Sequence, residues 1–107
     1  MSTPEKTKLA LPTIHLNGTS ADSLKEGWER AYAALNAARG ALCAASPNMR
    51  DFYVQKNAEE NFARAKDQHF NRLQKLEDIE KELVSLCEGV DAQVSEREKL
   101  RGGRSYA

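Results

Sequence analysis

Apolar positions repeat with helical spacing in two long stretches of the chain. In the first stretch the steps alternate between four and three residues, and in the second every step is three or four residues, which places the apolar side chains along one face of a helix. The pattern predicts a first helix starting near Ala21, ended by Ser46-Pro47-Asn48, and a second starting near Asn57 or Ala58. The first seam is Leu24, Trp28, Ala31, Leu35, Ala38 and Leu42, and the second is Phe62, Ala65, His69, Leu73, Leu76, Ile79, Leu83, Leu86, Val90 and Val94.

Two short segments outside these helices have the composition of strands. Ile14 and Leu16 alternate with polar neighbours, and Phe52 to Val54 are residues that favour a pleated, half-buried surface. They predict a small two-stranded ribbon. Asn17-Gly18 is a turn signal after the first segment, and Thr19 with Asp22 resembles a capping box.

The two predicted helices differ in length. At about 1.5 Å per residue, roughly 24 residues span about 36 Å and roughly 38 residues span about 57 Å. Folded back on the first helix, the second would leave Leu83, Leu86, Val90 and Val94 without an intrachain partner. Leaving these side chains exposed would lose roughly 1.5 to 3 kcal/mol of burial free energy for each. We therefore expect a mainly α protein, with a short N-terminal strand region and two long antiparallel helices, assembled as a symmetric homo-oligomer, at least a dimer.

Composition narrows the class of protein. The 107 residues suffice for one domain, which we place at 12–100 between a flexible arm at 1–11 and a flexible basic tail at 101–107. The 16 basic and 16 acidic residues balance, so no broad basic field favours DNA or RNA as a partner. No apolar run has membrane-spanning length, and Met1 to Lys8 do not resemble a secretory signal, so we expect a cytoplasmic protein. Cys43 and Cys87 lack metal or redox spacing and are expected as buried small hydrophobes.

The connection between the helices holds the most concentrated chemistry. Arg50, Phe52 and Tyr53 lie on a loop longer than a helical hairpin requires. An aromatic ring there could stack on a base while the arginine binds a phosphate. Alternatively, the aromatics only cap the bundle and Asp51 pairs with Arg50. Asn17 precedes a helix N-terminus, where N–H groups bind phosphate oxygens, or belongs to an ordinary turn.

A second candidate cluster lies on the second helix. Arg64, His69 and Arg72 could present donors to an anion, although a histidine on an apolar seam is equally expected as a core residue. The only other histidine is His15, which makes a zinc site improbable, and no metal or cofactor is expected. No Ser, Cys or Lys stands beside a base in an activating pattern, so we do not expect an enzyme.

Several of these segments together resemble a known family. They are Thr13-Ile-His-Leu-Asn-Gly-Thr19, the Ala-rich helix ending at Ser46-Pro-Asn48, Arg50-Asp-Phe-Tyr53, and the segment from Phe62 to Leu73. Across roughly residues 12 to 95 this arrangement is similar to the phage Thoeris anti-defence sponge proteins of the first type. That resemblance implies a homo-oligomer, dimeric or dimer-based, in the host bacterial cytoplasm. It also implies that the protein sequesters cyclic ADP-ribose isomers, such as a glycocyclic ADP-ribose, without cleaving them; some members of the family also sequester cyclic oligonucleotides.

The resemblance leaves the ligand contacts to be chosen by chemistry. The residues suited to adenine and pyrophosphate are Asn17, Arg50, Phe52, Tyr53, Arg64, His69 and Arg72, with Arg104 of the basic tail as a residue that could close over a pocket. The alternative function is a helical protein-interaction adaptor or virion-assembly factor that docks a partner helix on its apolar seam.

Overall fold

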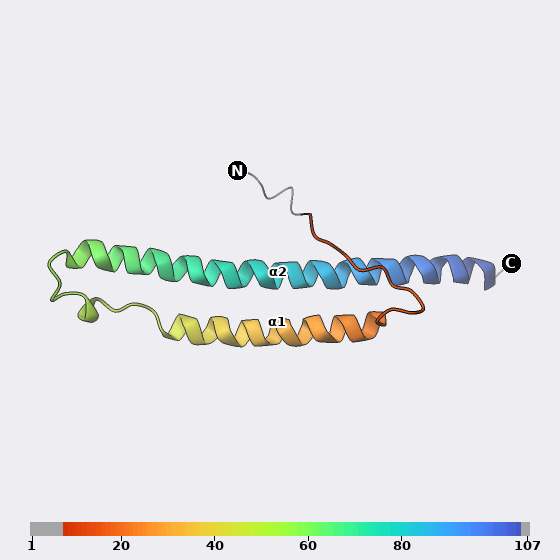
Figure 1. Cartoon of the computed structure of the whole chain (residues 1–107), viewed down its shortest axis with the longest axis horizontal. Helices are drawn as coiled ribbons and strands as arrows, with labels where there is room; N and C mark the ends of the chain where they lie inside the picture. The colour runs from red at the N-terminus through yellow and green to blue at the C-terminus, as the bar shows by residue number, and fades with distance from the viewer. Residues whose placement is uncertain (1–7, 106–107) are drawn as a thin grey trace. The chain divides into compact units, whose positions relative to one another are not determined.

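The computed structural model describes the backbone of residues 8–105 and the side chains of residues 8–100. Its elements in chain order are helix α1 (Ala21–Ala44), the short 3-10 helix η2 (Met49–Asp51) and helix α2 (Ala58–Ser105) (Figure 1). The chain is mainly α-helical, and both predicted helix starts are confirmed. Helix α1 has the predicted 24 residues, whereas α2 has 48 and continues to Ser105, within the segment that the sequence assigned to the tail.

Local hydrogen bonds set the ends of α1. The Ser20 hydroxyl accepts from the Ser23 amide at 3.1 Å, so Ser20 is the N-cap in place of the predicted Thr19. At the other end the Ser46 hydroxyl donates to the Cys43 carbonyl oxygen at 2.7 Å. That bond satisfies a carbonyl that has no partner within the helix, and α1 stops before Pro47.

The predicted β ribbon is not present in the described residues, 8–105, which contain no strand. Around Phe52 the Asn48 side chain accepts from the Arg50 amide at 2.9 Å and starts η2. The amides of Phe52 and Tyr53 both donate to the Met49 carbonyl oxygen at 2.9 Å. Because these local bonds satisfy the backbone, the segment forms turns and does not pair with a second strand.

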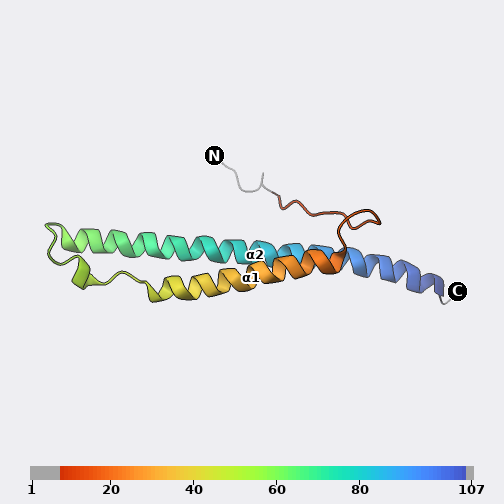
Figure 2. The ribbon, with the colours of Figure 1, turned by 60° about the horizontal axis from the view of Figure 1, so that its bottom comes forward.

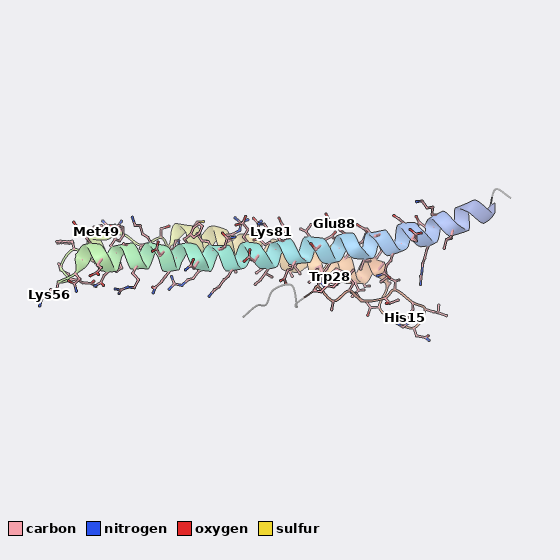
Figure 3. All side chains as sticks on the ribbon, turned by 90° about the horizontal axis from the view of Figure 1, so that it is seen from above. His15, Trp28, Met49, Lys56, Lys81 and Glu88 are labelled. Atoms are coloured by element: carbon pink, nitrogen blue, oxygen red, sulfur yellow. The ribbon has the colours of Figure 1, made fainter. Side chains whose placement is uncertain are left out.

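The described residues form two compact units. Unit 1 joins the chain up to Ala31 with the chain from Lys81 onward, and unit 2 is Tyr32–Glu80. In unit 2, Arg39 contacts Glu80 and Ser46 contacts His69, so the last part of α1 runs antiparallel to the first part of α2. Met49 and Lys56 of the connecting segment belong to this unit, whereas His15 and Trp28 belong to unit 1 (Figure 3).

In unit 1, both α1 and the N-terminal segment contact the second half of α2. Lys25 of α1 forms an ion pair with Asp91 at 2.6 Å, and the N-terminal segment binds α2 through Gln93 and Arg97. Both ribbon views show this segment, in red, beside the blue half of α2 (Figures 1 and 2). Val90 is 0% exposed, and Leu83, Leu86 and Val94 are half-buried.

The prediction that these four residues lack an intrachain partner is therefore wrong. Helix lengths alone leave out the N-terminal segment, which covers later turns of α2 through contacts at Gly89, Gln93 and Arg97. The prediction also placed the end of α1 opposite the beginning of α2. In unit 2, Ser46, two residues after the end of α1, instead lies beside His69, more than ten residues into α2.

The seam of α2 carries one charged residue that the sequence reading placed outside. Glu80 is 4% exposed, whereas Ile79, which the pattern assigned to the seam, is exposed. Arg39 of α1 binds Glu80 with its Nε and Nη2 atoms, each at 3.0 Å from a carboxylate oxygen. This two-point hydrogen bond compensates the burial of the carboxylate and raises the pKa of the Arg39 guanidinium.

None of the helices in the described part of the chain combines the length and apolar character required to cross a membrane.

Candidate functional site

Unit 2 contains an open hollow between the connecting segment and the first turns of α2. Its volume is about 400 Å³, and it is lined by Phe52, Gln55, Asn61, Arg64, Ala65 and Gln68. Phe52 comes from the end of η2, and Asn61, Arg64 and Gln68 share one face of α2 because they lie three and four residues apart. The hollow thus combines one aromatic ring, one guanidinium and three amide side chains.

A chain of hydrogen bonds holds the polar wall of the hollow in place. The Asn61 amide nitrogen donates to Gln55 Oε1 at 2.7 Å, and Arg64 Nη1 donates to Asn61 Oδ1 at 3.2 Å. This bond uses one of the five N–H groups of Arg64. The guanidinium is exposed, so its remaining donors can reach an anionic oxygen in the hollow.

The aromatic wall is also supported from behind. The rings of Phe52 and Phe62 lie 5.7 Å apart, centroid to centroid, and are tilted by 51°. Lys66 Nζ lies 4.7 Å from the centroid of Phe62, within the range of a cation–π contact. Phe52 is half-buried by this packing. The contact with a second ring supports the position of Phe52 beside the hollow.

His69 lies outside the hollow and faces α1. It is buried, and its Nε2 atom is 3.2 Å from the Ser46 hydroxyl. Ser46 already donates its single proton to the Cys43 carbonyl oxygen, so Nε2 must be the donor to Ser46 Oγ. This arrangement is the reverse of a nucleophile–base pair, in which the serine donates to the imidazole. His69 therefore joins the end of α1 to the seam of α2.

The structure separates the remaining predicted ligand residues of unit 2. Arg50 and Tyr53 are exposed and are not among the residues that line the hollow, whereas Phe52 and Arg64 are. Arg72 is exposed on α2 four residues beyond Gln68, which places it one turn past the hollow on the same face. Of the three residues predicted to bind one anion, Arg64, His69 and Arg72, only Arg64 lines this hollow.

Two predicted ligand residues lie outside unit 2. Asn17 belongs to the exposed turn of unit 1, where the Gly18 amide donates to the His15 carbonyl oxygen at 3.1 Å. The side chain of Arg104 lies outside the described residues.

Two titratable residues of unit 1, outside the hollow, have raised pKa values. Asp91 raises the pKa of Lys25 through their hydrogen bond, and burial raises the pKa of the Cys87 thiol. Cys43, expected as a buried thiol, is exposed, and Cys87 is half-buried. Within the described residues, no group of three or more His, Cys, Asp or Glu side chains is arranged to hold a metal ion.

Sequence reasoning did not assign Gln55, Asn61 or Gln68 to the site. The spacing of Asn61, Arg64, Gln68 and Arg72, at three, four and four residues, is a signal for one polar helix face that could have found two of them. Gln55 had no such signal, because its position depends on the turn after η2. In that turn the main-chain N–H of Gln55 donates to the Phe52 carbonyl oxygen.

These observations define a helical protein with an open polar and aromatic hollow in one of its two units. Comparison of the chain with known protein families, curated proteins and solved structures gives no match.

Proposed function

We propose that this protein binds a small phosphorylated nucleotide in the hollow of unit 2 and sequesters it without cleavage. The observation that carries this proposal is the presence of the Phe52 ring and the Arg64 guanidinium in a single hollow of about 400 Å³. A volume of this order suits a small organic ligand. The ring provides a surface for a base, and the guanidinium provides donors for a phosphate.

The amide side chains support a nucleotide rather than a simple anion. Gln55, Asn61 and Gln68 carry both donors and acceptors, which can pair with the edge of a base. Together with the family resemblance drawn from the sequence, this chemistry favours cyclic ADP-ribose isomers as ligands and the phage anti-defence sponge as the biological role. The setting of that role is the cytoplasm of the bacterial host.

Sequestration without cleavage agrees with the chemistry around the hollow. Its lining residues include no carboxylate, thiol, hydroxyl or imidazole that could act as a nucleophile or general base. The nearby Ser46 and His69 pair has its hydroxyl proton directed at a backbone carbonyl oxygen. Binding in this hollow would therefore leave the ligand intact.

The proposal includes self-association, because one copy leaves the hollow open. Small-molecule sites typically bury most of the surface of their ligand. Beside the hollow, Tyr53 is 66% exposed and Val54 is 76% exposed. A second copy packed over these side chains would remove apolar surface from water and cover the ligand in one step, giving a dimer or a dimer-based oligomer.

The test is a thermal-shift titration of the full chain with cyclic ADP-ribose isomers. Phe52→Ala and Arg64→Gln should each reduce the ligand-induced shift, because they remove the stacking surface and the charge-assisted donor. Arg30→Gln is the matched control, since Arg30 is an exposed arginine of α1 in unit 1.

Ligand recovered by heating the complex should have an unchanged mass. Hydrolysed ligand would indicate an enzyme. If neither Phe52→Ala nor Arg64→Gln alters a shift that the wild-type protein shows, the ligand lies elsewhere. If no cyclic nucleotide shifts the wild-type protein, the sponge function is wrong.

One observation favours the second candidate function, a helical protein-interaction adaptor or virion-assembly factor. Phe70 is 62% exposed on α2, away from the seam that His69 occupies. A large exposed aromatic side chain is a typical anchor for a partner protein. Phe70→Ser should abolish capture of a phage or host protein if this function holds, and should leave a nucleotide-induced thermal shift unchanged.

A further inference from the structure

The N-terminal segment binds α2 as a peptide ligand binds a receptor. The Gln93 side chain contacts the segment's main chain twice: Nε2 donates to the Pro12 carbonyl oxygen at 2.7 Å, and Oε1 accepts from the Ile14 amide at 3.0 Å. Arg97 donates to the Ile14 carbonyl oxygen. Residues separated by about eighty positions are thus joined through main-chain recognition of an extended segment.

Two aliphatic side chains complete this recognition. Leu11 lies directly over Gly89, so close that a Cβ atom at Gly89 would be 2.6 Å from Leu11 Cδ1. Ile14 is buried and is one of the two buried hydrophobic residues among the described side chains, the other being Val90. The receptor surface of α2 therefore consists of a notch at Gly89 and two polar side chains one and two turns further along.

We propose that this receptor surface on α2 also accepts the Leu11–Ile14 segment of a second copy of the chain, so that two copies exchange their N-terminal segments. All the contacts named above lie within four residues of the segment, and none depends on the segment being joined to the same α1. Ligand and receptor are present on every copy. Two copies can therefore satisfy each other reciprocally, which gives a closed dimer with two-fold symmetry.

The link between the segment and α1 is suited to this exchange. Residues 15–20 have exposed side chains, and their turn is closed by the main-chain bond from the Gly18 amide to the His15 carbonyl oxygen. Leu16, in the middle of the link, is 96% exposed. When the link straightens between two copies, the two Leu16 side chains can be covered, a gain that the closed single chain does not have.

This inference rests on the proposed self-association but names a different contact. A chain's own segment competes with the segment of a second copy for the same surface, and its short link gives it a high effective concentration there. Exchange keeps every contact between the segment and α2 and adds the surface between the two links. It is therefore favoured as protein concentration rises, whereas association at Tyr53 and Val54 does not involve the segment.

Mixed disulfide trapping tests the exchange. All chains carry Cys43→Ser and Cys87→Ser; one population adds Leu11→Cys and the other adds Gly89→Cys. The populations are mixed at high concentration, partly unfolded and refolded together, and oxidised. A disulfide between positions 11 and 89 can then form only between two chains. The same chain with both Leu11→Cys and Gly89→Cys measures trapping within one copy, and Leu11→Cys mixed with Gly40→Cys measures chance collision, because Gly40 has open space around it.

We expect a disulfide-linked species of twice the chain mass at several times the level of the Gly40→Cys mixture. Circular dichroism confirms that the variants remain helical. A level of linked dimer no higher than that of the collision control would overturn the exchange. If light scattering still shows a dimer in that case, self-association stands without the exchange. As a second measurement, Leu16→Ser should lower the dimer fraction of otherwise wild-type chains, and an unchanged fraction would contradict the role of the link.

Discussion

Gly89 is a residue of low helix propensity in the interior of α2, at a position where the N-terminal segment packs. Alanine is favoured over glycine within a helix by about 1 kcal/mol. At Gly89, however, an added Cβ would collide with Leu11, and the notch that holds the N-terminal segment would be filled. Gly40 of α1 has nothing within 4 Å of the corresponding position and is the matched site.

Gly40→Ala should therefore raise the stability of the protein by about 1 kcal/mol, from helix propensity alone. Gly89→Ala should give none of this gain, because Leu11 must move away. It should also accelerate hydrogen exchange of the Ile14 amide, whose acceptor is Gln93. Thermal unfolding and amide exchange measure the two effects. Equal stabilisation by both variants, with Ile14 still protected, would contradict the packing of Leu11 on Gly89.

The two cysteines should differ in reactivity. Cys43 is exposed, whereas Cys87 is half-buried and its pKa is raised, mainly by desolvation. A raised pKa keeps more of the thiol protonated at a given pH, and the thiolate is the form that reacts. Alkylation should therefore modify Cys43 first, and the pH profile of Cys87 should be displaced upward. Peptide mass mapping distinguishes the sites, and in denaturant the two rates should converge.

At the scale of the helices, the sequence predicted where they start but not how they are aligned with each other. The starts followed from local signals, since apolar periodicity and Ser46-Pro47-Asn48 act within a few residues. The ribbon at Ile14 and Phe52 failed because strand propensity depends on a partner, and both segments instead satisfy their backbone through side chains or local turns.

The pair of Arg39 and Glu80 determines how the two helices of unit 2 are aligned. Glu80 occupies the buried seam position that the periodic pattern assigned to Ile79, and its charge is compensated by the two bonds from Arg39. Sliding one helix past the other would leave the carboxylate buried without a partner, which is strongly unfavourable. The apolar residues alone would tolerate a shift of seven residues.

Arg39→Ala should lower the midpoint of thermal unfolding by several degrees, because it strands the Glu80 carboxylate. The double variant Arg39→Leu/Glu80→Leu should recover the lost stability, since apolar side chains replace the whole pair, while helix alignment becomes less well defined. Disulfide trapping between introduced cysteines can report the alignment. A double variant as unstable as Arg39→Ala would show that packing, rather than the stranded charge, is responsible.

At the scale of the whole molecule, the candidate site was only partly accessible to sequence reasoning. Phe52 and Arg64 were chosen from the sequence because loop aromatics and arginines are suited to nucleotides wherever they lie, and in the structure both line one hollow. The sequence could not show that His69 and Asn17 do not line the hollow. Their positions depend on which part of α1 faces which part of α2, and on where the turn at Gly18 lies.

Self-association is the corresponding prediction at this scale. Light scattering coupled to size exclusion at micromolar concentration should return at least twice the chain mass. Val54→Asp should return the mass of one chain, because it places a charge on the surface proposed to be buried, while the isolated fold is retained since Val54 is exposed there. Val84→Asp, at an exposed valine of unit 1, serves as the control. A wild-type mass near 12 kDa would contradict both the oligomer and the closed ligand site.

The bond between Ser46 and His69 has a consequence for how the chain tolerates being cut. Both Arg39 and Ser46 precede the connecting segment, and their partners Glu80 and His69 follow it, so the matching groups of unit 2 are divided between the two sides of that segment. A protease cleavage near Lys56 would produce two peptides that still carry complementary halves of each contact. Such peptides should reassociate in their original alignment, making the connection a natural position for splitting the protein into a reporter pair.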